Sequence, residues 1–336
     1  MVMLAIDVGN RKVCVVDGSC RGEQIIISSW GEAEYTAEFV SNGVIKDRVA
    51  LANTISRLLK SKHIKSSSAF VTINSKEIIT RNLTFPNVKN QVLQVLVKNE
   101  MTEFLGPEND YIIDFINNGT TPENMLNIIC YAVPTHIVKD YYYLLKDLHK
   151  KPAAMDINAV SMYKLIGNST KINGCNISKG NVIVTDIGYS KMNLHVYCNG
   201  EYELCRTESS PVQDFANEMA TLVGKEANID LMSRIDLSPE KKYDNPAVGD
   251  ACRYFIFRLV DDIQHYIQYV VSSSADNSIE KIYLCGGISR VHGIDEALSS
   301  YLKIPVEVVS SIDRISAPRG CPLNCICYAA GALIRL

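Results

Sequence analysis

The chain has 336 residues with a net charge of −3, from 34 basic and 37 acidic residues, and 47% of its residues are hydrophobic. This length and composition indicate two domains, or one large bilobed domain, with a buried core. The near-neutral charge argues against a dedicated nucleic-acid-binding protein, and no apolar run approaches the ~18–20 residues of a membrane span. The first residues do not resemble a signal peptide, so the eleven cysteines indicate reduced thiols in a cytoplasmic protein.

The first half of the chain predicts alternating strands and helices. It opens with a strand that ends in an Asp-x-Gly turn, a second strand up to Gly18, and a third strand at Gln24–Trp30. Branched and aromatic residues support these strands. The elements expected next are a helix at Arg48–Lys60, strands at Ala69–Ile73 and Lys76–Thr84, a helix at Asn90–Leu105, strands at Tyr111–Asn117 and Met125–Val133, and a helix at Thr135–Leu148.

The second half opens on a copy of the first strands. Val182–Ile187 leads into a second Asp-x-Gly turn, and further strands follow up to Gly200 and at Glu201–Arg206. A repeat half a chain length away predicts two similar lobes that face each other, in an α/β protein. The remaining elements expected are helices at Pro211–Val223 and Cys252–Ser272, a strand at Ile282–Cys285, a helix at Ile294–Leu302, a strand at Val306–Val309 and a helix at Tyr328–Leu333.

The two Asp-x-Gly turns have a definite chemical use. The backbone N–H groups of such a turn form a concave anion site, and glycine lets a phosphate approach the main chain. The carboxylates of Asp7 and Asp186, at the strand ends, would orient water molecules on Mg²⁺. Two facing turns would hold a triphosphate from both sides, and Gly286-Gly287 would approach the nucleoside. The pattern therefore favours nucleotide binding.

Other site motifs are scarce. The chain has no Gly-x4-Gly-Lys-Ser/Thr, Gly-x-Gly-x-x-Gly, His-Glu-x-x-His or Gly-x-Ser-x-Gly motif. Cys321, Cys325 and Cys327 suggest zinc, but no second cysteine pair with finger spacing accompanies them, so structural thiols are favoured. His195 and His265 are interpreted as packing or surface residues.

Several further segments occur in the same order as in a known family. They are Asn42–Asp47, Phe85-Pro86 followed by Glu100 and Phe104-Leu105, Tyr131–Pro134, Pro152–Ile157, Ile282–Ile294 and the Ala-Ala-Gly-Ala-Leu-Ile-Arg ending. Together with the two turns, they make the chain similar over nearly its whole length to the PilM family. This family belongs to the actin-like ATPase superfamily and consists of cytoplasmic proteins of type IV pilus assembly.

The resemblance implies an α/β, actin-like (ribonuclease H-like) fold of two lobes. An α+β subdomain would be inserted in lobe 1 and a small helical subdomain in lobe 2. The implied boundaries are residues 1–75, 152–174 and 316–336 for the lobe 1 core, 76–151 for the inserted subdomain, 175–215 and 275–315 for the lobe 2 core, and 216–274 for the helical subdomain.

The resemblance also implies ATP and Mg²⁺ as cofactors, with Asp7 and Asp186 as metal-binding residues. The residues implied in nucleotide binding are Gly9, Asn10, Arg11, Lys12, Asp186, Gly188, Ser190, Lys191, Asp262, Gly286, Gly287 and Ile288. A surface ion pair between Arg258 and Asp262, four residues apart on a helix, explains Asp262 equally well.

The second phosphate turn departs from the family pattern. Tyr189 and Met192 stand in a segment where small hydroxyl residues are usual, and Ser209-Ser210 replaces a pair of glycines. No residue is clearly placed to activate a water molecule for attack on a γ-phosphate, so no catalytic residue is assigned. We expect at most a weak ATPase, in which ATP acts mainly as a structural or gating ligand.

The related FtsA family is the main competitor, because Asp7–Val13 resembles its first turn more closely. FtsA proteins end in a linker and an amphipathic membrane-targeting helix, and this sequence stops at its last predicted helix without such a segment. The expected route to the membrane is therefore a partner. In the PilM family this partner is the bitopic inner-membrane protein PilN, whose short cytoplasmic N-terminal tail would dock as an extended peptide on the inserted subdomain and its junction with lobe 1.

Three alternatives stay open at this point. The first is an FtsA-like division protein that polymerises on membranes. The second is an ATPase or small-molecule kinase of the same superfamily, which would need a second substrate pocket and a catalytic base. The third is an actin-like fold whose altered second turn no longer binds nucleotide.

Overall fold

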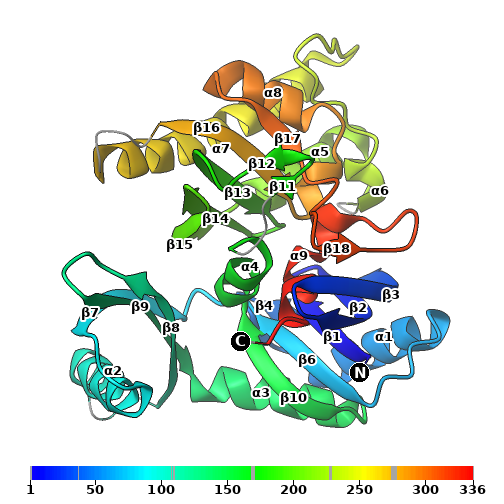
Figure 1. Cartoon of the computed structure of the whole chain (residues 1–336). Helices are drawn as coiled ribbons and strands as arrows, with labels where there is room; N and C mark the ends of the chain where they lie inside the picture. Colours follow the sequence, from blue (N-terminus) through cyan, green and yellow to red (C-terminus); the bar gives the residue numbers. More distant parts are fainter. Residues whose placement is uncertain are drawn as a thin grey trace.

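The computed structural model describes residues 2–36, 38–106, 108, 110–167, 171–226, 229–273 and 278–335. In this part of the chain, two large sheets form the centres of two lobes, and a smaller sheet lies beside the first lobe (Figure 1). Helices α4 (Asn158–Ile166) and α9 (Leu323–Ala332) lie between the two large sheets and share one core with both of them. The lobes are therefore packed through a central helical layer.

The sheet of lobe 1 has the strand order β10-β6-β1-β2-β3-β18. Its strands are β1 (Met3–Val8), β2 (Lys12–Arg21), β3 (Gln24–Glu34), β6 (Ser68–Ile73), β10 (Lys151–Ile157) and β18 (Ile315–Ser316). Strand β1 pairs antiparallel with β2 and parallel with β6. Helices α1 (Arg48–Ser61) and α3 (Thr135–Asp147) pack on the outer face of this sheet.

The alternation of side chains along β1 decides where its aspartate lies. Leu4 and Ile6 pack in the outer core with α1 and α3, whereas Ala5 packs in the central core with α4 and α9. Successive side chains of a strand point to opposite faces, so Asp7 faces the central layer like Ala5.

The sheet of lobe 2 repeats this arrangement, with the strand order β15-β14-β13-β16-β17. Its strands are β13 (Asn181–Ile187), β14 (Lys191–Cys198), β15 (Glu201–Ser209), β16 (Ile279–Cys285) and β17 (Val306–Val308). Strand β13 pairs antiparallel with β14 and parallel with β16. Val184 packs in the central core and Ile183 in the outer core, so Asp186 also faces the central layer. The two aspartates therefore point toward each other from the two sheets.

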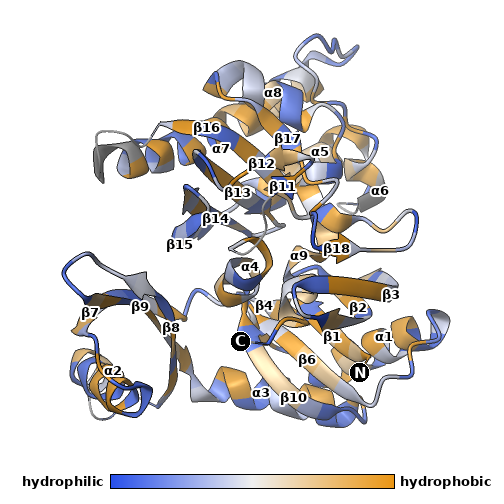
Figure 2. Cartoon of the chain, in the orientation of Figure 1, coloured by the Kyte–Doolittle hydropathy of each residue, from blue (hydrophilic) through white to orange (hydrophobic). Residues whose placement is uncertain are grey.

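Helices cover the outer face of the second sheet and form one core with it. They are α5 (Val212–Val223), α6 (Ile229–Met232), α7 (Pro246–Ser273) and α8 (Ile294–Leu302), with the short 3-10 helix η1 (Gly287–Arg290) at the end of β16. Figure 2 shows that hydrophobic residues concentrate in the strands of the large sheets and in α9 between them. No helix in the described ranges is both long and apolar enough to cross a membrane.

The third sheet has the strand order β7-β9-β8 and lies beside lobe 1 (Figure 1). It consists of β7 (Ile79–Pro86), β8 (Tyr111–Thr120) and β9 (Met125–Pro134), and α2 (Asn90–Leu105) packs on one face through its own small core. The opposite face carries Ile129 and Tyr131, which belong to the central core. At the β8–β9 end, the Asn118 side chain donates a hydrogen bond of 2.7 Å to the carbonyl of Tyr202 in β15. This sheet therefore reaches from lobe 1 to lobe 2.

Most of the elements predicted from the sequence are confirmed, with shifted ends. The strand predicted at Lys76–Thr84 begins at Ile79, and the helix predicted at Tyr328–Leu333 is Leu323–Ala332. Strands β10 and β18, helices α4 and α6, and two short strand pairs were not predicted from the sequence. The pairs are β4 (Val40–Ser41) with β5 (Val44–Ile45) and β11 (Lys171–Ile172) with β12 (Cys175–Asn176). The predicted boundary between residues 274 and 275 lies outside the described residues.

Candidate functional site

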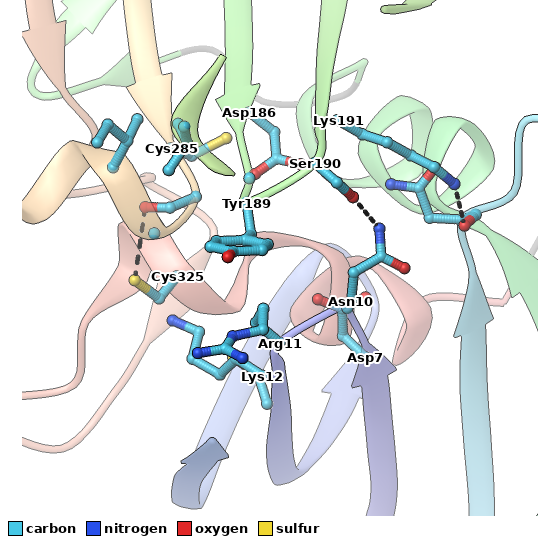
Figure 3. A pocket seen from close by; sticks show the side chains of 18 of the residues that line it. Asp7, Asn10, Arg11, Lys12, Asp186, Tyr189, Ser190, Lys191, Cys285 and Cys325 are labelled. Atoms are coloured by element: carbon cyan, nitrogen blue, oxygen red, sulfur yellow. Dashed lines mark hydrogen bonds between the residues drawn. The ribbon is translucent and has the colours of Figure 1, made fainter. Parts of the chain in front are cut away.

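A cavity of about 180 Å³ lies where the ends of the two large sheets face each other. Three turns line it: the β1–β2 turn of lobe 1, the β13–β14 turn of lobe 2, and the turn that follows β16 (Figure 3). Side chains of α4 and α9 complete the wall. The two Asp-x-Gly motifs and the Gly286-Gly287 pair are thus brought together, as the sequence predicts.

The β1–β2 turn is closed by a hydrogen bond of 2.9 Å from the Gly9 N–H to the Lys12 carbonyl. Asp7 lies just before this turn and accepts a hydrogen bond of 2.6 Å from the Thr72 hydroxyl. Burial raises the pKa of Asp7 to about 6; the bond from Thr72 opposes this shift and the nearby Asp186 carboxylate adds to it. Two carboxylates therefore share one poorly solvated cavity.

The β13–β14 turn has the same geometry. The Gly188 N–H donates a hydrogen bond of 2.9 Å to the Lys191 carbonyl, which matches the bond that closes the first turn. Asp186 accepts a hydrogen bond of 3.0 Å from the Asn193 side chain, and burial raises the pKa of its carboxyl group. The predicted repeat is therefore confirmed down to the hydrogen bond within each turn.

The turn after β16 needs its first glycine. Gly286 has a φ of +86°, and a Cβ there would lie 2.2 Å from an Asp186 carboxylate oxygen. A Cβ on Gly287 would meet nothing within 4 Å. This side of the cavity is apolar, because it is lined by Val212, Ala216, Met232, Ile288 and Val291.

The two lobes touch directly across the cavity (Figure 3). The Asn10 side chain donates a hydrogen bond to the Ser190 hydroxyl, and the Arg11 guanidinium lies 5.0 Å from the centre of the Tyr189 ring. The Lys191 side-chain nitrogen donates a hydrogen bond of 2.8 Å to the carbonyl of Asn74 in lobe 1. Side chains of the β13–β14 turn thus contact lobe 1 directly.

A further cross-lobe contact lies at the rim of the cavity. Arg290 of η1 donates a hydrogen bond of 2.9 Å to the Glu32 carboxylate of β3, and Lys12 lies 3.2 Å from the same carboxylate. Burial alone would raise the pKa of Glu32, but the bonds from Arg290 and Lys12 lower it below its ordinary value. This carboxylate is therefore ionised and joins one cation from each lobe.

Lys191 gives the site a measurable pH dependence. Its side chain is 3% exposed, and burial, with the nearby Lys76 charge, lowers its pKa to about 7. Between about pH 7 and 10.5 the unfolded chain binds a proton that the folded chain lacks, so this group makes stability rise with pH. We therefore expect the unfolding free energy of the wild type, relative to that of Lys191→Met, to rise by up to about 1.4 kcal/mol per pH unit in this range.

Urea denaturation of both proteins at pH 7, 8 and 9 measures this difference. Lys242→Met, at an exposed loop position, serves as the control and is expected to follow wild type at all three pH values. Parallel profiles for wild type and Lys191→Met would contradict the assignment of a neutral buried lysine at the second turn.

Asp262 is not part of the cavity. The residues predicted for nucleotide binding that do line it are Gly9, Asn10, Arg11, Lys12, Asp186, Gly188, Ser190, Lys191, Gly286, Gly287 and Ile288, together with Asp7. Asp262, on α7, instead lines a separate hollow with Arg206, Glu208 and Tyr266. Burial raises the pKa of Asp262, and the nearby Arg258 charge opposes this shift.

Sequence reasoning missed several residues of the cavity. Asn158, at the start of α4, is 5% exposed, and its side-chain oxygen has no hydrogen-bond partner in the described chain. It directly follows β10, a strand that the sequence analysis did not predict. Four free thiols also line the cavity: Cys14, Cys285, Cys325 and Cys327. Cys325 and Cys327 were noticed only as a possible zinc cluster; within the described residues, no group of three or more His, Cys, Asp or Glu side chains could hold a metal ion.

Comparison with solved structures identifies the fold. A structure described as "PilM-PilN type IV pilus biogenesis complex" matches with a TM-score of 0.80 at 16% sequence identity, covering 98% of this chain and 97% of the other. The ethanolamine utilization protein EutJ from Carboxydothermus hydrogenoformans matches with a TM-score of 0.58 at 12% identity, covering 99% and 89%. MreB5 of Spiroplasma citri, bound to ADP, matches with 0.51 at 12% identity, covering 98% and 94%. The predicted actin-like fold of two lobes is confirmed.

Comparison by sequence places the chain among its relatives. A search among curated proteins gives no significant match. A family model described as "Type IV pilus assembly protein PilM" matches residues 5–325, which is nearly the whole chain. The chain belongs to the PilM family of type IV pilus assembly proteins.

Proposed function

We propose that this protein is a nucleotide-binding scaffold of type IV pilus assembly. Mg-ATP would bind between the lobes, and a groove beside the cavity would receive the short cytoplasmic N-terminal tail of a bitopic inner-membrane protein similar to PilN. The protein would then be cytoplasmic and would reach the membrane through this partner. The proposal includes the domain division given above, with residues 76–151 as the inserted subdomain. The observation that carries it is the pair of matched turns facing each other across one cavity.

The two ends of the cavity suit the two ends of ATP. The apolar side at Gly286-Gly287 offers a purine and ribose close approach to the backbone, while the two turns offer N–H groups to phosphates. MreB5, which has the same fold at 12% identity, was solved with ADP. No general base for water is assigned among the described residues of the cavity, and ATP would act as a ligand that fixes the lobes rather than as a substrate for rapid turnover.

The fit of Mg²⁺ rests on two observations. Asp7 and Asp186 are close enough for the charge of one to raise the pKa of the other, and a divalent cation would remove that repulsion. The unpartnered oxygen of buried Asn158 could accept a hydrogen bond from a water molecule on the metal. Mg²⁺ would be held here through its water molecules, as it prefers.

The proposed peptide groove has a volume of about 620 Å³ and three walls. Lobe 1 contributes Asn74 and Asn158, the third sheet contributes Thr80, Asn82 and Tyr131, and lobe 2 contributes residues 204–209 of β15. Strand β15 is an edge strand, so its free backbone groups can pair with an extended peptide. Tyr131, which is 3% exposed, lies in the wall of the groove, and its hydroxyl has no partner in the described chain.

A matched pair of variants tests the groove. Thr80 and Thr84 are both exposed and lie on the same face of β7, but only Thr80 lines the groove. We expect Thr80→Arg to weaken binding of a synthetic tail peptide of the PilN-like partner at least tenfold in isothermal titration, because the longer side chain fills the groove. Thr84→Arg should stay within twofold of wild type. Absence of peptide binding by wild type, with and without Mg-ATP, would refute the scaffold function.

A further inference from the structure

Tyr189 occupies the polar end of the cavity. It lies at the tip of the β13–β14 turn between Gly188 and Ser190, and its ring points toward the β1–β2 turn (Figure 3). The Arg11 guanidinium lies 5.0 Å from the ring centre, in cation–π contact. Tyr189 is half-buried, and within the described part of the chain no hydrogen bond of its hydroxyl is found, so the ring is held by packing and by Arg11.

The size of the cavity shows the consequence of this placement. Its volume of about 180 Å³ lies below the ~300–1,000 Å³ that is usual for small-molecule sites. The apolar side near Gly287 is open, whereas the space between the two turns holds the Tyr189 ring, the Arg11 side chain and the Asn10–Ser190 hydrogen bond. A purine could enter the open side, but a chain of phosphates would meet the aromatic ring.

We propose that Tyr189 is a gate that must leave Arg11 before a polyphosphate can bind between the two turns. This inference rests on the proposed function, since the gated ligand is Mg-ATP. In the closed state the lobes are held by side chains of the two turns; in the open state Arg11 exchanges the ring for phosphate. Only the open fraction of the protein binds Mg-ATP. The apparent dissociation constant is therefore the dissociation constant of the open state divided by that fraction.

The expected effect follows from the strength of the contact. Cation–π contacts of this kind correspond to about a fivefold to thirtyfold change in an equilibrium constant. Removing the ring should therefore tighten Mg-ATP binding by about this factor, although a side chain has been deleted from the site. If Tyr189 is a gate, Tyr189→Ala should bind Mg-ATP more tightly than wild type. If Tyr189 instead contacts the bound nucleotide, the same substitution should weaken binding.

The test compares wild type, Tyr189→Ala, Tyr189→Phe and Tyr254→Ala by isothermal titration with ATP in excess Mg²⁺. Tyr189→Phe keeps the ring and is expected to keep the gate, and Tyr254→Ala removes an exposed tyrosine of α7 that does not line the cavity. Labelling by N-ethylmaleimide, followed by peptide mass spectrometry, adds a readout that does not need nucleotide. Cys325 lines the cavity, and Cys130, fully buried in the core of the third sheet, serves as the internal reference.

The gate predicts tighter Mg-ATP binding and faster Cys325 labelling in Tyr189→Ala, with Cys130 labelling unchanged. Equal or weaker Mg-ATP binding by Tyr189→Ala than by wild type would overturn the gate and leave the nucleotide function standing. Faster Cys325 labelling without Mg-ATP binding by any of the proteins would overturn the nucleotide function and keep Tyr189 as the gate of the cavity. Unchanged labelling without Mg-ATP binding would overturn both.

Discussion

Replacing Lys164 with methionine is expected to lower the free energy of unfolding by about 3–5 kcal/mol, because it breaks a buried ion pair. Lys164 lies on α4 and is 3% exposed. Its ammonium group donates a hydrogen bond to the Asp156 carboxylate at the end of β10 and another, of 2.8 Å, to the carbonyl of Ile334 beyond α9. Burial lowers the pKa of this lysine while Asp156 opposes the shift. The substitution leaves the buried Asp156 carboxylate with Arg335, at 3.0 Å, in place of two cations.

Urea denaturation at pH 7.5 measures this loss. Lys139→Met, at an exposed position of α3, is the matched control and should change stability by less than about 0.5 kcal/mol. The double variant Asp156→Leu/Lys164→Met should recover much of the stability, since it removes the buried carboxylate together with the buried lysine. A loss below about 1 kcal/mol for Lys164→Met would show that this pair does not tie α4 and α9 to the first sheet.

The second large effect is expected at Asp7, where stability and binding should change in opposite directions. Asp7→Asn should raise the free energy of unfolding of the nucleotide-free protein by about 2–3 kcal/mol at pH 7.5, because it removes a charge held near Asp186 in a poorly solvated cavity. The asparagine can still accept the hydrogen bond from Thr72. The same substitution should abolish Mg-ATP binding, since it removes one of the two carboxylates that would hold the metal.

The pH dependence of this gain has a definite sign. The pKa of Asp7 is about 6 in the folded protein against an ordinary value of 3.8 for an aspartate side chain, so the folded protein binds one more proton than the unfolded chain between these pH values. Stability from this group is therefore greatest below about pH 3.8 and is lost as the pH rises through 6. The advantage of Asp7→Asn should vanish toward pH 4 and be complete above pH 7.

Thermal and urea denaturation at pH 4.5, 6 and 7.5 follow this profile. Asp244→Asn makes the same chemical change at an exposed loop position and should match wild type at each pH. If Asp7→Asn destabilised the nucleotide-free protein at pH 7.5, the buried charge of Asp7 would stabilise the fold. This would contradict the claim that the charge is kept at a cost in stability for metal binding.

Much of the site could be predicted because its geometry is local. A strand fixes the face on which each residue lies, so the sequence around Asp7 and Asp186 determines that both face the same layer once two similar lobes are assumed. Gly286 is likewise required by a positive φ and by contact with Asp186. The order of short motifs along the chain, which includes residues far from the cavity, predicted the family that the comparisons confirm.

The rest depends on contacts that no local pattern encodes. Asp262 lies on the 28-residue helix α7. The spacing between Arg258 and Asp262 does not determine which face of this helix is turned toward the cavity, and Asp262 lines a separate hollow. Asn158, Cys325 and Cys327 reach the cavity because α4 and α9 pack between the sheets, which is a long-range result of the fold. The contact between Tyr189 and Arg11 joins two turns that are half the chain apart.

Nucleotide in the cavity and peptide in the groove are expected to stabilise the same arrangement of the lobes. Asn74 and Asn158 line both spaces, and Lys191 of the second turn is bonded to Asn74. Isothermal titration of the tail peptide into the wild-type protein, with saturating Mg-ATP and without it, tests this most directly. Coupled sites predict peptide binding at least fivefold tighter in Mg-ATP, and by reciprocity Mg-ATP binding tighter by the same factor in the presence of peptide. Peptide binding of equal affinity under both conditions, while Mg-ATP itself binds, would contradict the account.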